Sequence, residues 1–139
     1  MYRSIDLRKN ALGIFVMLAA IAWIFAAGQH HYDVNEVSTQ EAKSLIDTGA
    51  SVIDVRGPEH FKAGHIPGAM LLPLEVLQRG IPASIQLLKD KAIVVYCGDG
   101  VTSGPEGTEL LNKAGFAKAV NLKHGMESWT GAGYPVKKG

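Results

Sequence analysis

The one cysteine of this 139-residue chain, Cys97, stands where a nucleophile could act. It directly follows the apolar run Ala92–Tyr96, which is typical of a buried parallel strand, and a helix is expected from Ser103. Ligands of open parallel α/β sheets bind beyond the carboxyl ends of the strands. A lone cysteine is more often a small buried hydrophobe, but the glycines around Cys97 favour a catalytic role.

The loop after the cysteine is rich in glycine and consists of Gly98, Asp99, Gly100, Val101, Thr102 and Ser103. Its backbone N–H groups can turn toward the sulfur, and the following helix N-terminus adds to this anion-binding cradle. Each hydrogen bond to a charged sulfur is worth roughly 1.5–3 kcal/mol, so two or three could bring the thiol pKa from about 8.5 to below neutrality. The charge of Asp99 opposes this effect. We expect Asp99 to point outward to solvent, and we expect the loop to bind substrate.

Alternating strand and helix signals surround this loop. The spacing predicts a helix behind the capping box 38–41, strands at 51–55 and 69–72, a short helix at 74–79, the strand at 92–96, a helix from the capping box 103–106 to Gly115, a strand at 119–122 and a helical turn at 125–130. Such alternation predicts an α/β fold in which a mostly parallel sheet has helices on both faces.

An apolar segment precedes the domain. Residues 11–27 carry no charge, and Arg3, Arg8 and Lys9 stand before them. The segment is near the lower length limit for a membrane helix, for which roughly 20 apolar residues are usual, and it also resembles a signal peptide cleaved near Gly28. We favour a retained membrane anchor. The positive-inside rule then places the domain on the extracytoplasmic, periplasmic side, and cleavage would give an exported soluble protein instead.

The remaining sequence fits one domain. We assign residues 1–28 to the anchor or signal segment, 29–35 to a linker and 36–139 to the domain. The formal net charge of +1 gives no field that would attract nucleic acid. His30, His31 and Asp33 lack the spacing of metal ligands, so we expect no metal site.

Several ordered motifs resemble the rhodanese-like family. They include VIDVR at 52–56, GHIPGA at 64–69, the strand that enters Cys97, AGF at 114–116, Asn121-Leu122 and GMESW at 125–129, and the resemblance spans about residues 34–136. It implies a five-stranded parallel sheet. It also implies that Cys97 takes a sulfane sulfur from a small donor such as thiosulfate, becomes a persulfide and passes the sulfur to cyanide or a thiol. No metal or organic cofactor is required.

The loop departs from the family pattern at its sixth residue, where many active members have an arginine and this chain has Thr102. A hydroxyl donates one hydrogen bond but does not neutralise an anionic donor. His124 also replaces a frequent glycine. Phosphatases and arsenate reductases of the same fold use a loop arginine, and neither Thr102 nor Ser103 supplies one. The alternative function is therefore a non-enzymatic module that carries sulfide or binds a partner.

Other conspicuous side chains point to structure. We expect Asp54 and Arg56 to hold the adjoining loops by hydrogen bonds or an ion pair, although Arg56 could also bring positive charge near the site. We expect His65 to be architectural, Trp129 to be core and His124 to be an exposed surface residue that could instead border the loop.

Overall fold

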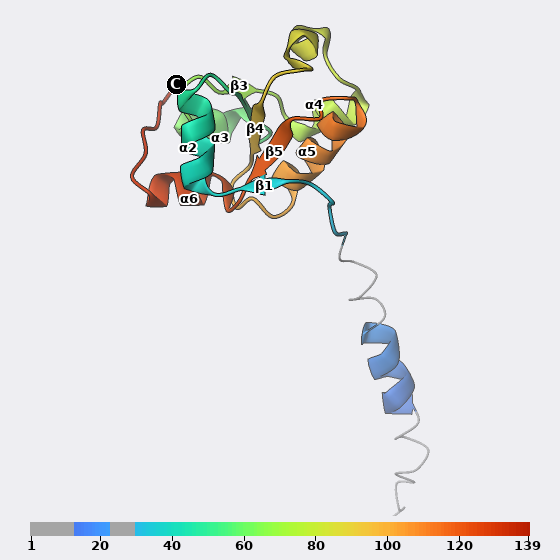
Figure 1. Ribbon diagram of the computed structural model, residues 1–139. Coiled ribbons are helices and arrows are strands. Elements are labelled where there is room, and N and C mark those ends of the chain that lie inside the picture. The colour runs from blue at the N-terminus through green and yellow to red at the C-terminus, as the bar shows by residue number, and fades with distance from the viewer. Residues whose placement is uncertain (1–12, 23–29) are drawn as a thin grey trace, which may run out of the picture. The chain divides into compact units, whose positions relative to one another are not determined.

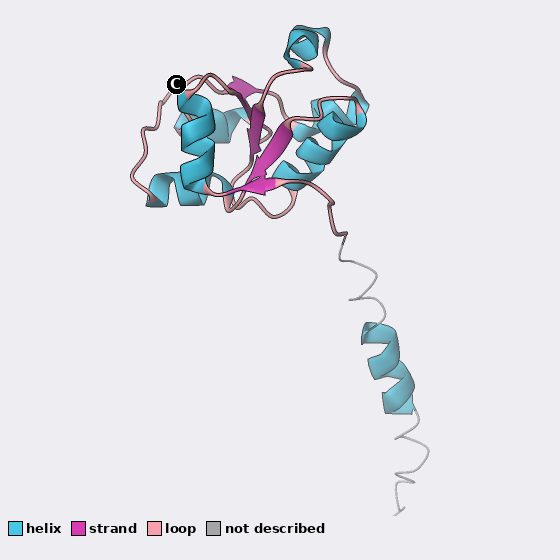
Figure 2. Cartoon of the chain, viewed as in Figure 1, coloured by secondary structure: helices cyan, strands magenta, loops and turns pink. Residues whose placement is uncertain are grey.

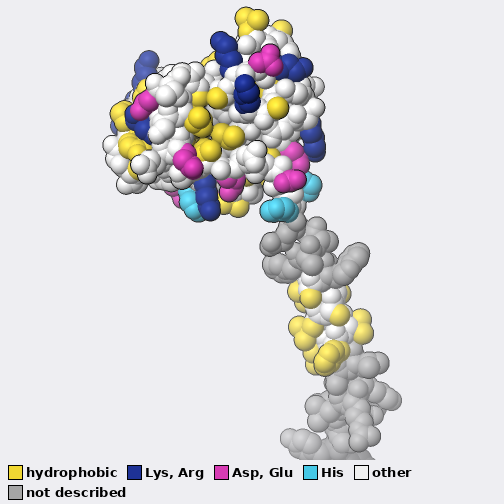
Figure 3. Space-filling model, viewed as in Figure 1, with side chains coloured by type: hydrophobic (Ala, Val, Ile, Leu, Met, Phe, Trp, Pro, Cys, Tyr) yellow, Lys and Arg dark blue, Asp and Glu magenta, His cyan; other side chains and the backbone are white. Residues whose placement is uncertain are grey.

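The computed structural model describes residues 13–22 and 30–139, and the chain divides into two units, Met1–His31 and Tyr32–Gly139. In the first unit, residues 13–22 are helical and expose apolar side chains (Figure 3). Phe15 is 77% accessible. None of the helices within 13–22 and 30–139 is long and apolar enough to cross a membrane. The membrane segment predicted over residues 11–27 therefore gains no support here, and residues 11–12 and 23–28 lie outside the described part. Localisation stays a prediction.

A five-stranded sheet forms the centre of the second unit (Figures 1 and 2). Its strands are β1 (Glu36–Val37), β2 (Ser51–Asp54), β3 (Met70–Leu71), β4 (Ile93–Tyr96) and β5 (Ala119–Leu122), and their order is β1-β5-β4-β2-β3. All four strand pairs are parallel. The predicted five-stranded parallel sheet is confirmed. The four strands that the sequence located are no longer than their predicted spans, and the fifth, β1, lies at a position that the sequence did not predict.

Helices cover both faces of the sheet, as predicted. They are α2 (Thr39–Asp47), α3 (Pro58–Ala63), α4 (Leu74–Arg79), the 3-10 helix η1 (Ala83–Leu88), α5 (Ser103–Lys113) and α6 (Gly125–Gly131). Figure 1 shows α2 and α6 on one side of the sheet and α4 and α5 on the other. The sequence did not predict α3 or η1.

Two apolar clusters hold these layers together. On one face, Ala42 of α2 and Trp129 of α6 share a cluster with Val94 of β4. On the other, Leu77 of α4 and Leu111 of α5 share a second cluster with alternate residues of the same strands. Because side chains alternate across a strand, β4 contributes apolar groups to both clusters and all four of its residues are buried.

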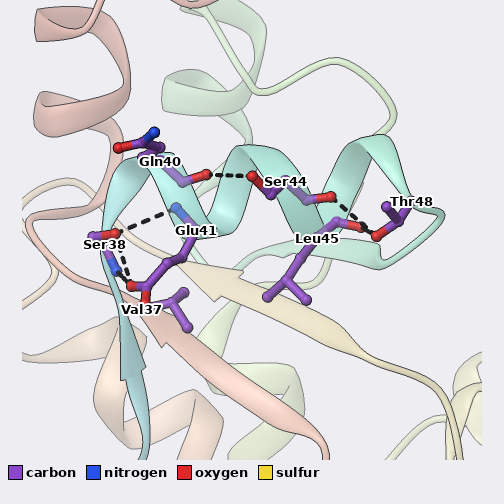
Figure 4. A pocket seen from close by; sticks show the side chains of 7 residues that line it. All are labelled: Val37, Ser38, Gln40, Glu41, Ser44, Leu45 and Thr48. Carbon is purple, nitrogen blue, oxygen red and sulfur yellow. Dashed lines mark hydrogen bonds between the residues drawn. The ribbon is translucent and has the colours of Figure 1, made fainter.

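The predicted capping box of α2 is present (Figure 4). The Glu41 amide donates to Ser38 Oγ at 3.3 Å, and the Ser38 amide donates to Glu41 Oε2 at 2.7 Å. Hydrogen bonds from the Ser38 backbone and hydroxyl lower the pKa of the Glu41 carboxyl. Local sequence therefore fixes the start of this helix.

The second predicted capping box, over residues 103–106, is wrong. Helix α5 already includes Ser103, its N-cap is Thr102, and no side chain caps it. The Glu106 carboxylate instead accepts hydrogen bonds from Tyr32 Oη at 3.1 Å and from Gln78 Nε2 at 2.7 Å. Long-range contacts thus outweigh the local pattern at this helix start.

Substitution of Ser38 by alanine should lower the free energy of unfolding by about 1 kcal/mol, because an amide of the first helical turn loses its partner. Urea denaturation of the full-length chain measures the change. The control is Ser84→Ala, at an exposed serine whose hydroxyl bonds to none of the described residues, and it should stay within about 0.5 kcal/mol of the parent. Equal losses in both variants would contradict the capping role.

Candidate functional site

Cys97 directly follows β4 and its loop is tied to helix α6. The Cys97 carbonyl accepts a hydrogen bond from the Met126 amide at 2.9 Å, and the Gly98 carbonyl accepts one from the Glu127 amide at 3.0 Å. These two bonds also satisfy N–H groups in the first turn of α6, which otherwise lack partners within the helix. Cys97 is only 3% exposed and belongs to the apolar cluster that contains Leu77 of α4 and Leu111 of α5.

The sulfur makes polar contacts within its own loop. The Gly100 amide donates to Cys97 Sγ at 3.2 Å, and the thiol lies 3.6 Å from Asp99 Oδ1, to which it donates. The same carboxylate oxygen accepts a hydrogen bond from the Val101 amide at 3.0 Å. Asp99 is exposed, but the prediction that it points outward is wrong, because its carboxylate oxygen accepts from both the thiol and the Val101 amide. The bond to Val101 is a side-chain turn of the kind that aspartate often forms with the amide two residues on.

Burial raises the pKa of the Cys97 thiol. Hydrogen bonds from the Gly104 and Gly100 amides lower it, while the charge and hydrogen bond of Asp99 raise it further, and the net direction is upward. The expectation of a thiol pKa below neutrality is therefore wrong. Only two amides offset the loss of hydration, so the surroundings of Cys97 favour the neutral thiol over the thiolate.

Two glycines let the backbone approach closely around the sulfur. A Cβ on Gly104 would lie 2.5 Å from Asn121 Oδ1 and 3.2 Å from Cys97 Sγ. Gly100 has φ +74°, and a Cβ there would lie 2.4 Å from the His124 amide nitrogen. A side chain on Gly104 would push the start of α5 away from Cys97 and β5, and one on Gly100 would push the loop away from β5 and the start of α6.

Asn121 of β5 is a site residue that the sequence reasoning missed. It is fully buried, and its Nδ2 donates to the Gly100 carbonyl at 3.1 Å and to Glu36 Oε1 at 3.0 Å. Its Oδ1 is buried beside Gly104 and has no hydrogen-bond partner within the described part of the chain. A polar residue inside an otherwise apolar strand was the signal that could have identified it.

A cavity of about 440 Å³ opens beside the thiol. Five of the predicted site residues line it, and they are Cys97, Gly98, Asp99, Thr102 and Ser103. The other two do not: Gly100 is buried beneath the loop, and Val101 is 63% exposed. The remaining walls come from segments distant in sequence, including His60 and Glu75.

Arg56 also lines this cavity, but its guanidinium is already paired. Nε lies 3.0 Å from Asp54 Oδ1, Nη2 lies 2.7 Å from Asp54 Oδ2, and Nη2 also donates to the Gly64 carbonyl at 2.7 Å. The Asp54 side chain is completely buried. This ion pair matches the structural role predicted for both residues.

The other conspicuous side chains take structural positions. His65 is buried, with Nδ1 2.8 Å from the Phe61 carbonyl, and Trp129 donates from Nε1 to the Pro135 carbonyl at 2.8 Å. His124 is exposed, has left-handed backbone geometry and caps α6. Within residues 13–22 and 30–139, no group of three His, Cys, Asp or Glu side chains could hold a metal ion.

Comparison with known families agrees with the fold and the motifs, because the rhodanese-like domain matches residues 38–132. The chain belongs to the rhodanese-like family. The sheet order, the cysteine after β4 and the cavity beside it are thus features of a rhodanese-like domain in this chain.

Individual relatives of this rhodanese-like protein cover most of its length. The uncharacterized protein YqhL of Bacillus subtilis is 30% identical over 123 residues, which are 88% of this chain and 94% of YqhL. A sulfurtransferase of Allochromatium vinosum is 30% identical over 106 residues, 74% of this chain and 94% of its own. The human single-domain sulfurtransferase TSTD1 has a TM-score of 0.61 at 30% identity, over 69% of this chain and 95% of TSTD1. Sulfur transfer is supported at the level of the family.

Substitution of Gly104 by alanine should lower the free energy of unfolding by about 1–3 kcal/mol, because the new methyl group overlaps buried atoms. Gly98→Ala, in the loop that precedes α5, is the control, since a Cβ there meets no atom within 4 Å. Urea denaturation of both variants measures the difference. A Gly104→Ala protein as stable as Gly98→Ala would show that the start of α5 has more room beside Cys97 than its geometry indicates.

Replacement of Asp99 by asparagine should lower the pKa of the Cys97 thiol, because the carboxylate charge that favours the neutral thiol is removed. The side-chain oxygen that accepts from the Val101 amide is retained. The pH dependence of alkylation by iodoacetamide reports this pKa, and Cys97 is the only thiol in the chain. Asp90→Asn, at the opposite end of β4, is the control and should leave the profile unchanged. A pKa that stays constant or rises in Asp99→Asn would contradict the assigned role of this carboxylate.

Proposed function

We propose that this rhodanese-like domain is a sulfurtransferase in which Cys97 carries sulfane sulfur as a persulfide. The observation that carries the proposal is the position of the sole thiol, at the carboxyl end of β4, beside a cavity and in hydrogen-bond contact with a loop amide. The relatives named as sulfurtransferases support the same class of activity.

The reaction needs a thiolate, because the thiolate is the nucleophile in exchange between sulfur atoms. The Cys97 thiol first loses its proton, for which Asp99 Oδ1 is the adjacent acceptor. The thiolate attacks the sulfane sulfur of the donor, a new S–S bond forms, and the donor's bond to that sulfur breaks with its electron pair. With thiosulfate the leaving group is sulfite.

The second half of the reaction returns the enzyme to its starting state. Cyanide or a thiolate attacks the outer sulfur of the persulfide, and the Cys97 thiolate leaves. The anionic persulfide would be stabilised by the loop amides, as electron-rich intermediates are in other preorganised sites. No metal or organic cofactor takes part in these steps.

A second candidate function is a non-enzymatic carrier of sulfide or a module that binds a partner. The raised pKa of the Cys97 thiol favours the partner-binding module, because burial and Asp99 disfavour the thiolate that sulfur transfer needs. The loop also lacks an arginine, and the Asp99 carboxylate lies beside the sulfur. A carrier would take up one sulfur per chain and stop.

Steady-state turnover separates the two functions. Intact mass of the full-length protein is measured before and after thiosulfate, cyanide is then added, and thiocyanate is followed over many turnovers. We expect a gain of one sulfur atom on Cys97 that cyanide removes repeatedly, and we expect Cys97→Ser to lose both signals. One sulfur taken up without turnover would favour the carrier, and a fully active Cys97→Ser protein would refute the assignment of the nucleophile.

A further inference from the structure

The cavity beside Cys97 is lined by acidic side chains from three separate elements. Glu75 comes from α4, Asp99 from the cysteine loop and Glu127 from α6, and all three are exposed. Among the described residues that line the cavity, none is a lysine and one is an arginine, Arg56. The fold therefore gathers negative charge around the one nucleophile of the chain.

The charge of Arg56 does not offset these carboxylates. Its Nε and Nη2 atoms are bound to Asp54 and to the Gly64 carbonyl, and its side chain is only 12% exposed. The Asp54 carboxylate is completely buried, so its negative charge needs the Arg56 guanidinium as a partner. The charges of Asp54 and Arg56 therefore cancel within the wall of the cavity. Besides Cys97 itself, His60 is the other titratable group among the described lining residues, so three carboxylates dominate the side-chain charge that a substrate meets.

We propose that this cavity selects sulfur donors and acceptors that carry a positive charge near the reacting sulfur. Aminothiols and their persulfides belong to this chemical class, whereas thiosulfate carries two negative charges and is disfavoured. An ammonium group would interact favourably with Glu75 and Glu127 while the sulfur reaches Cys97. This selection rests on the proposed sulfur transfer at Cys97.

The transfer from such a donor is balanced without an oxidant. The Cys97 thiolate attacks the terminal sulfur of an aminothiol persulfide, and the bond between the two sulfur atoms of the donor breaks. The electron pair leaves with the aminothiol, which takes up a proton in place of the one that Cys97 released. Cys97 becomes the persulfide and the donor becomes a free aminothiol.

The charge preference can be measured without any sulfur transfer. Full-length protein is treated with three methanethiosulfonate reagents that carry a trimethylammonioethyl, a methyl or a sulfonatoethyl group, and each rate is divided by the rate with 2-mercaptoethanol. Each reagent forms a mixed disulfide with Cys97 and releases methanesulfinate. We expect the cationic reagent to react about tenfold faster than the anionic one, with a ratio that falls as salt is added.

Variants assign the preference to the cavity. Glu75→Gln combined with Glu127→Gln should reduce the cation-to-anion ratio at least about threefold. The control Asp90→Asn removes an exposed carboxylate at the far end of β4 and should leave the ratio unchanged. Equal normalised rates in the parent, an unchanged ratio in the double variant, or a thiol that no reagent modifies would each overturn the proposal.

Sulfur loading then distinguishes this inference from the function on which it rests. Cysteamine persulfide and thiosulfate are compared as donors by intact mass, and we expect faster loading from cysteamine persulfide. Loading at equal rates from both donors would overturn the charge selection but keep the sulfurtransferase. Absence of loading from either donor would overturn the sulfurtransferase itself, whatever the methanethiosulfonate rates show.

Discussion

The close approach of the cysteine loop to β5 and α6 is the constraint on which the site depends. Gly104 leaves space that Asn121 Oδ1 and the Cys97 sulfur occupy, while Gly100 turns back beneath His124 with a positive φ. The loop carbonyls then meet the first amides of α6, so the same contacts fix the loop and complete the helix. The sulfur is consequently buried, and its polar contacts are the Gly100 amide and the Asp99 carboxylate, with no cationic side chain among them. Both its acidity and its access to substrate follow from this packing.

Sulfur transfer needs a thiol that is held in place and a thiolate that is stable, and burial of Cys97 has opposite effects on the two. It fixes the thiol beside the cavity, but it also removes water that would stabilise the thiolate, and the thiol pKa rises. Two amides offset part of this cost, and the Asp99 carboxylate adds to it. A donor or acceptor with a positive charge would, while bound, compensate for the arginine that the cysteine loop lacks. Under the proposed charge selection, a cationic substrate would supply the positive charge that the site lacks, which links the acidic lining to the raised thiol pKa.

How well the sequence predicts this protein depends on the range of the interactions involved. The α2 cap and strand β4 follow from neighbouring residues, and both are confirmed. The two-residue strand β1 and the six-residue helix α3 are too short to carry a periodic signal. The cap expected at Ser103 fails because Glu106 bonds to distant Tyr32 and Gln78. Likewise, Cys97 and its loop were predicted as the candidate site, but the pKa direction and the acidic lining arise only from tertiary packing.

The Asp54–Arg56 pair shows why a nearby arginine does not replace one in the loop. Asp54 is completely buried, and an ionised carboxylate in that position is stable only while the guanidinium and neighbouring donors contact it. If Arg56 turned toward an anionic substrate, a buried negative charge would be left without its partner, at a cost of several kcal/mol. A single hydrogen-bonded contact with a substrate anion returns roughly 1.5–3 kcal/mol. Arg56 therefore remains with Asp54, and the substrate meets the three exposed carboxylates of the lining instead.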